Sequence, residues 1–165
     1  MPDIYQGTEL WDLSLVDPDN RRPVDFVLRR EMLERARPAA AADALAGLDS
    51  GLAKLWLIQR VLELRKRRPE LFDAAARYVP SKAIGKRAEH VIAFGRGADL
   101  VVVAPRLVSG IGWPAPQWGD TTVELAESPW HDELSDAEHK GGTVKLARLL
   151  GAFPMAVLVR EGARR

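Results

Sequence analysis

The sequence predicts an α+β chain, with helices in its first part and a small antiparallel β-domain from about residue 70. Two observations support this. Apolar residues recur every three or four positions before Pro69, and after it they alternate with a period of two. Short β-rich runs, two of them joined by a glycine-containing turn, then follow, as is typical of hairpins. We therefore predict two domains, residues 1–69 and residues 70–165.

Three helices are expected in the first domain. Pro23 suits a first helical position, so a helix is predicted over residues 23–36, and an Ala-rich one over residues 39–48. The clearest helix has Asp49 or Ser50 as its cap and ends at a basic run before Pro69. Its wide apolar stripe predicts packing against a large neighbour, and comprises Leu52, Leu55, Trp56, Leu57, Ile58, Val61, Leu62 and Leu64.

The second domain is predicted to consist of short strands punctuated by prolines. Residues 90–94 and 100–104 are β-rich runs joined by a five-residue turn with two glycines. The further candidate strands are residues 76–79, 121–125, 142–146 and 153–159.

Composition limits the classes of function. Among 165 residues, 24 Lys and Arg balance 23 Asp and Glu, and this argues against a nucleic-acid partner, whose phosphates need a surplus of cations. The absence of Cys excludes disulfides and thiolate metal sites. The longest apolar run is far below the roughly 20 residues of a membrane span, and no signal peptide is visible. We expect a cytoplasmic chain without membrane partner, metal or cofactor, and its abrupt start suggests a piece of a longer protein.

The first motif, residues 2–11, places Tyr5, Gln6 and Glu9 around Gly7. An aromatic ring can stack on a sugar face, while carboxylates and amides can bond its hydroxyls. A strand that simply enters a tight turn explains the same residues.

The second motif, residues 15–25, concentrates charge in a loop. Asp17, Asn20, Arg21 and Arg22 lie within six positions, and guanidinium groups suit carboxylates or neighbouring hydroxyls. An Asx-turn with a helix cap is the structural alternative.

Weaker signals lie elsewhere. His90, His131 and His139 lack metal-ligand spacing and are expected at the surface or at caps, and the basic run 65–68 is read as a solvated helix end rather than a phosphate patch. Trp113, Trp118 and Trp130 could be sugar platforms, although core or hairpin packing is the favoured explanation.

The two N-terminal motifs together resemble the maltooligosyl trehalose synthase family, which belongs to the alpha-amylase superfamily of glycoside hydrolases. The segments 54–62 and 118–121 are also similar to it. The resemblance implies that the chain is a C-terminal fragment: the last strand and helix of a (β/α)8 barrel, followed by a C-terminal antiparallel β-sandwich.

The resemblance also implies a function. The whole enzyme would isomerise the reducing-end α-1,4 linkage of maltodextrin to an α,α-1,1 linkage. Its catalytic carboxyl groups would lie upstream, so no catalytic residue is expected here and the chain alone should be inactive. Substrate-binding residues would be Tyr5, Gln6, Glu9, Asp17, Asn20, Arg21 and Arg22.

The expected partners are maltodextrin and the missing barrel portion, and an exposed apolar helix face around Trp56 and Leu57 predicts self-association of the isolated chain. Two alternatives stay open. One is a fragment of a sister enzyme such as the trehalohydrolase, and the other is a non-catalytic glucan-binding or structural module.

Overall fold

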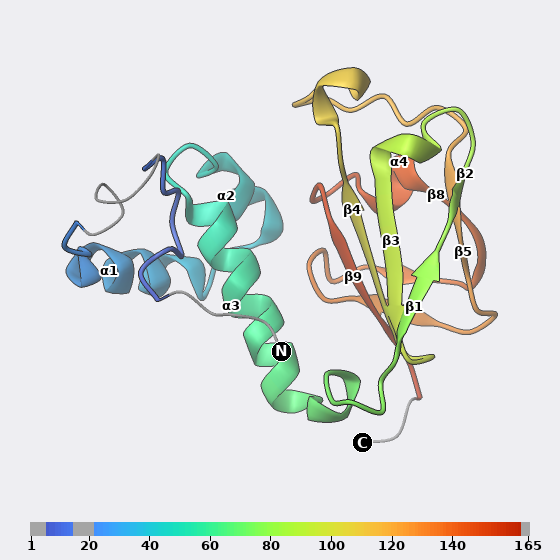
Figure 1. The fold of residues 1–165 in the computed structure, drawn as a ribbon, viewed down its shortest axis with the longest axis horizontal. Coiled ribbons are helices and arrows are strands. Elements are labelled where there is room, and N and C mark those ends of the chain that lie inside the picture. The colour runs from blue at the N-terminus through green and yellow to red at the C-terminus, as the bar shows by residue number, and fades with distance from the viewer. Residues whose placement is uncertain (1–5, 15–21, 163–165) are drawn as a thin grey trace. The chain divides into compact units, whose positions relative to one another are not determined.

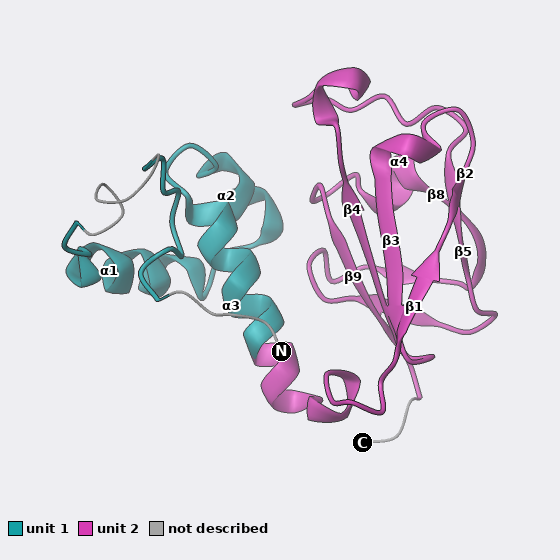
Figure 2. Ribbon diagram, in the orientation of Figure 1, with its two compact units in different colours: residues 1–62 teal, residues 63–165 magenta. Residues whose placement is uncertain are grey.

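The computed structural model describes residues 6–14 and 22–162, which form an α+β chain with mostly antiparallel sheets (Figure 1). The α+β class predicted from the sequence is confirmed at this level. The contacts divide the chain into two compact units, residues 1–62 and 63–165, each described here by itself (Figure 2). The division falls within a helix rather than after Pro69.

Residues 6–14 and 22–62 of the first unit include three helices: α1 (Phe26–Ala36), α2 (Ala41–Ala46) and α3 (Leu52–Arg67), the last of which continues into the second unit. The first helix begins later than predicted, because the Asp25 carboxylate caps it by accepting a hydrogen bond from Leu28 N at 2.8 Å. Neither Asp49 nor Ser50 directly precedes α3. Gly51 does so with a φ of 83°, a conformation that glycine adopts without strain.

A small core joins the three helices. The Trp56 ring on α3 is 2% exposed and its Nε1 donates to Ala39 O at 2.9 Å. Met32, Ala36 and Ala44 from the other two helices are also buried. Trp56 of the predicted apolar stripe is therefore buried, so the exposed face expected around it is wrong for that ring, whereas Leu62 of the same stripe is 52% exposed.

The described part of the second unit contains nine strands in two sheets. One sheet has the order β1-β3-β4-β9-β6-β7 and the other the order β2-β5-β8, and every pairing is antiparallel. The strands are β1 (Tyr78–Ser81), β2 (Ala83–Ile84), β3 (Val91–Arg96), β4 (Leu100–Pro105), β5 (Thr122–Leu125), β6 (Trp130–Asp132), β7 (Glu138–His139), β8 (Gly142–Lys145) and β9 (Ala156–Arg160).

Short helical pieces connect the strands. They are the 3₁₀ turns η2 (Pro69–Leu71), η3 (Ala88–His90) and η4 (Val108–Ile111), and the short helix α4 (Leu146–Leu149). All six predicted strands are present with ends shifted by up to three residues, whereas β2, β6 and β7 were not predicted. These three strands have only two or three residues, too short for a period of two to be visible.

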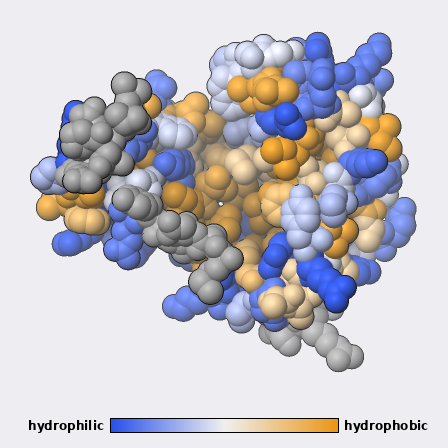
Figure 3. Space-filling model, in the orientation of Figure 1, coloured by the Kyte–Doolittle hydropathy of each residue, from blue (hydrophilic) through white to orange (hydrophobic). Residues whose placement is uncertain are grey.

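The core of the second unit takes side chains from both sheets. Alternation sends Ala93, Val103 and Leu158 to one face of the larger sheet, and the smaller sheet contributes Val123 and Val144. The face shown in Figure 3 mixes hydrophobic and hydrophilic residues over this unit. The large apolar side chains that the unit leaves exposed are Tyr78, Val79, Ile84, Ile92, Leu107 and Trp113.

Candidate functional site

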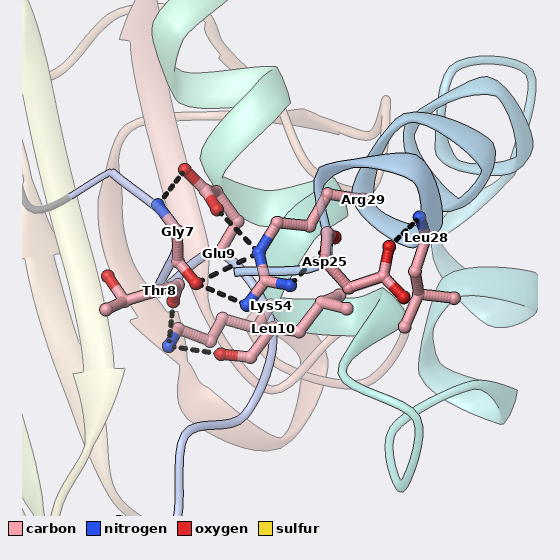
Figure 4. A network of polar contacts seen from close by, with 8 residues as sticks. All are labelled: Gly7, Thr8, Glu9, Leu10, Asp25, Leu28, Arg29 and Lys54. Atoms are coloured by element: carbon pink, nitrogen blue, oxygen red, sulfur yellow. Dashed lines mark hydrogen bonds and ion pairs between the residues drawn. The ribbon is translucent and has the colours of Figure 1, made fainter. Parts of the chain in front are cut away.

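The first predicted motif forms a network of polar contacts between the N-terminal loop and two helices (Figure 4). Gly7 N donates to Glu9 Oε1 at 3.0 Å, which closes a tight turn in which Gly7 has a φ of 95°. A Cβ at Gly7 would lie 2.6 Å from Val24 Cγ2, so both the backbone conformation and the space require glycine here.

Arg29 ties this turn to α1. Its Nε lies 2.9 Å from Gly7 O and 3.2 Å from Glu9 Oε2, while Nη1 donates to Asp25 O at 3.1 Å. A second guanidinium nitrogen, Nη2, also donates to Gly7 O. One side chain therefore fixes the turn against the first residues of the helix, as the converging dashed lines in Figure 4 show.

Lys54 ties the same loop to α3. Its Nζ donates to Thr8 O at 2.6 Å and to Leu10 O at 2.9 Å, and it lies 5.5 Å from the centre of the Trp11 ring. Trp11 Nε1 donates to Leu48 O, yet about half of that side chain is exposed. The loop thus presents a held aromatic ring at the surface.

The two carboxylates of this loop, Glu9 and Asp12, have lowered pKa values and act as hydrogen-bond acceptors. Burial raises the pKa of Glu9, but the hydrogen bond from Gly7 N and the Arg29 charge bring it below its ordinary value of 4.5. Hydrogen bonds from Ser14 lower the pKa of Asp12 below 3.8. A general acid needs a raised pKa, so neither group is suited to donate a proton at neutral pH.

Of the predicted binding residues, the structure describes Gln6, Glu9 and Arg22. Gln6 and Arg22 are exposed, and Glu9 lies in the network just described. The remaining four, Tyr5, Asp17, Asn20 and Arg21, lie outside the described residues.

Sequence reasoning missed Arg29 and Lys54, which hold the loop. They lie 22 and 46 residues from the Gly7 and Thr8 oxygens that they bind. Nothing in their local sequence distinguishes them from other surface cations on helices.

The weaker motifs have structural roles. Trp118 is buried in the core of the second unit and Trp130 is 1% exposed, so neither ring is a surface platform. Trp113 is 36% exposed. Thr121 is fully buried and its Oγ1 accepts from Arg87 N at 3.0 Å, so the segment 118–121 fixes a turn before β5.

Two of the three histidines differ from expectation, whereas the basic run is a largely exposed helix end, as predicted. His90 and His139 are buried rather than at the surface, and His90 Nδ1 lies 3.1 Å from Leu107 O. In the run 65–68, Arg67 pairs with Glu133 at 2.7 Å, Arg68 pairs with Glu70, and the Arg65 guanidinium lies 5.6 Å from the centre of the Phe72 ring. Three of its four cations therefore have partners of their own, which disfavours a phosphate patch.

Residues 6–14 and 22–162 contain no group of three His, Cys, Asp or Glu placed to hold a metal ion. In the same ranges no helix combines the length and the apolar character that a bilayer crossing requires.

Comparison with known proteins places this chain within one group of much larger proteins. No family model matches it. A putative maltooligosyl trehalose synthase of Mycobacterium tuberculosis is 37% identical over 163 residues, which are 99% of this chain and 19% of that protein.

Solved structures agree. The maltooligosyltrehalose synthase of Arthrobacter ramosus superposes with a TM-score of 0.79 and 43% identity, over 96% of this chain and 20% of that one. Another maltooligosyl trehalose synthase gives a TM-score of 0.69 and 29% identity, over 97% of this chain and 19% of that one.

The chain therefore aligns with one continuous part of much larger proteins. Specifically, it is related over almost its whole length to the maltooligosyl trehalose synthases, and it spans about one fifth of the relatives that it matches. The resemblance seen in the two N-terminal motifs is confirmed, and this coverage fits the predicted C-terminal portion.

Proposed function

We propose that this chain serves as the C-terminal portion of a maltooligosyl trehalose synthase and contributes to the binding of maltodextrin in the assembled enzyme. The observation that carries the proposal is the match over 99% of the chain to only 19% of such an enzyme. The whole enzyme isomerises the reducing-end α-1,4 linkage of its substrate to an α,α-1,1 linkage, in the pathway to trehalose.

In this proposal the first domain, residues 1–69, is the end of a (β/α)8 barrel and α3 is its last helix. Residues 70–165 are a C-terminal β-sandwich. The loop before α1 then belongs to the barrel rim, where enzymes of this fold bind their substrates. The tight Gly7 turn, fixed by Arg29 and Lys54, supports this assignment because a binding loop must hold its shape.

The substrate-binding residues of the proposal are those that the sequence predicted: Tyr5, Gln6, Glu9, Asp17, Asn20, Arg21 and Arg22. Glu9 is ionised and held by two donors, so its remaining lone pairs can accept from sugar hydroxyls. Arg22 is exposed and precedes α1 by four residues. Together these groups would clamp the terminal glucose while water is kept out.

The isolated chain is expected to be inactive. Retaining glycoside chemistry needs two carboxyl groups about 5 Å apart, one of which keeps its proton. The carboxyl groups with lowered pKa in this loop, Glu9 and Asp12, do not provide the protonated partner. Self-association of the chain belongs to the same proposal, and light scattering tests it: a clean monomer would contradict it.

A chimaera tests the main proposal. The matching fifth of the Arthrobacter ramosus enzyme is replaced by this chain, and the products from maltopentaose are separated by chromatography. Retained formation of trehalose-ended sugar is expected, whereas a folded chimaera without activity contradicts the proposal.

Within that chimaera, Arg22→Ala tests the clamp. It should shift product from trehalose-ended sugar toward free glucose. Arg30→Ala, an exposed cation on α1, is the matched control. Equal product ratios for the two variants would remove Arg22 from the proposed site.

A further inference from the structure

A cavity of about 730 Å³ lies in the second unit. It is bordered by β7 and β8, the last strands of the two sheets, and by α4. Its polar lining residues are Glu138, His139, Lys140, Thr143, Lys145, Arg148 and Glu161.

The cavity lining contains more cations than carboxylates, and its cations have no ion-pair partner among the described residues. In the part of the chain that the structure describes, Lys140, Lys145 and Arg148 form no ion pair. The Glu138 carboxylate is already bound at 2.6 Å by His131 Nδ1. Three cations therefore face one cavity with a single other carboxylate, that of Glu161.

His139 adds an unsatisfied polar atom. The residue is 6% exposed, lines the cavity, and its buried Nε2 has no hydrogen-bond partner among the described residues. Burial lowers the pKa of His139 below 6.5, against the raising effect of Asp132, and the Arg148 charge lowers it further. A neutral imidazole offers one N–H donor, and buried polar groups without partners are uncommon in folded proteins.

The backbone beside His139 is fixed. A Cβ on Gly141 would lie 2.0 Å from Ala126 O and 2.6 Å from Glu127 Cα, so the β7–β8 connection packs directly on its neighbour. The lining side chains of this connection thus start from a rigid base, as a specific site requires.

We propose that this cavity binds a phosphate group, either as free inorganic phosphate or as part of a phosphorylated sugar. Guanidinium and ammonium groups bind phosphate oxygens through charge-assisted hydrogen bonds, and Lys140, Lys145 and Arg148 supply such groups here. The cavity volume of about 730 Å³ is larger than a phosphate group alone requires and leaves room for a hexose. This inference does not depend on the proposed function, because none of these residues belongs to the N-terminal site.

The test uses the full 165-residue chain labelled with ¹⁵N. Inorganic phosphate, glucose 6-phosphate and glucose are titrated separately while amide shifts are followed by NMR. Saturable shifts confined to residues 138–148 are expected with both phosphates and not with glucose. Tighter binding of glucose 6-phosphate identifies the phosphorylated sugar as the ligand, whereas equal affinity identifies the phosphate group alone.

Single-residue variants distinguish a specific phosphate site from non-specific electrostatic attraction of anions. Arg148→Ala and Lys145→Gln should each weaken phosphate binding about tenfold, as the loss of one charge-assisted contact does. Lys82→Ala is the matched control, since Lys82 is an exposed cation beside β1 and β2, the opposite edges of the two sheets.

Three outcomes would overturn the proposal. They are non-saturable shifts, equal shifts with glucose, and an equal loss of binding in the Lys82→Ala chain. Urea unfolding of each variant shows that it is folded, so that a loss of binding reports on the site.

Discussion

Asp132 provides the sharpest test of how the second unit is held together. The residue ends β6 and is fully buried, and its Oδ1 accepts from Leu134 N and from Val157 N, each at 3.1 Å. Its Oδ2 accepts from Ser135 Oγ at 2.5 Å. One carboxylate thus joins the β6–β7 turn to the central strand β9, across 25 residues of sequence.

The expected cost of Asp132→Ala follows from the donors that it leaves behind. Leu134 and Val157 are 1% and 3% exposed, so their N–H groups cannot turn to water. Each buried donor without a partner costs about 1–3 kcal/mol, and the pair therefore about 2–6 kcal/mol. Against a typical stability of about 5–15 kcal/mol for a domain, this loss is a large fraction of the total, so the unit should unfold at a much lower urea concentration.

Urea unfolding followed by circular dichroism measures this loss. Asp73→Ala is the matched control, because Asp73 also accepts from two backbone N–H groups, at 2.8 and 3.1 Å, but is exposed. Water can replace the bond to Ala75 N, which belongs to an exposed residue, so a smaller loss of stability than for Asp132→Ala is expected. Asp132→Asn keeps an oxygen acceptor, so its loss of unfolding free energy should lie between those of Asp132→Ala and Asp73→Ala. Equal losses for Asp132→Ala and Asp73→Ala would refute the reasoning.

Three further predictions concern packing and pH. Trp56→Phe removes a buried hydrogen bond and ring volume, so it should lower the free energy of unfolding by about 2–3 kcal/mol. Leu62 is half exposed on the same helix, so Leu62→Ala should cost under about 1 kcal/mol in the same urea assay. The pKa of His139 is lower in the folded chain than its ordinary value of 6.5, so its contribution to stability is present above pH 6.5 and lost as pH falls toward the folded pKa. Urea midpoints at pH 7.5 and 5.5 should differ less in His139→Gln than in the unchanged chain, and an identical pH dependence would contradict this. Gly141→Ala should prevent a stable fold in thermal unfolding because its Cβ meets a backbone oxygen at 2.0 Å, while Gly119→Ala, with open space but a φ of 58°, should cost only about 1–2 kcal/mol.

Most of the element types could be predicted from the sequence because their signals are local. The apolar stripe around Leu55 and the single proline after it, Pro69, define α3, and alternation defines β3 and β4 on either side of their turn. The first helix was misplaced by three residues, since Pro23 and Asp25 are both acceptable starts and only the hydrogen bond to Leu28 N distinguishes them.

The sequence by itself determined the α+β class, the order of the longer elements and the likeness of the N-terminal motifs to one enzyme family. These properties depend on residues close together in the chain. Only the tertiary structure decided that Arg29 and Lys54 hold the Gly7 turn, that Asp132 joins β6 to β9, and that the cations of β8 and α4 share a cavity with His139. Each of these depends on contacts between segments far apart in sequence, which the pairing of strands and the packing of helices bring together.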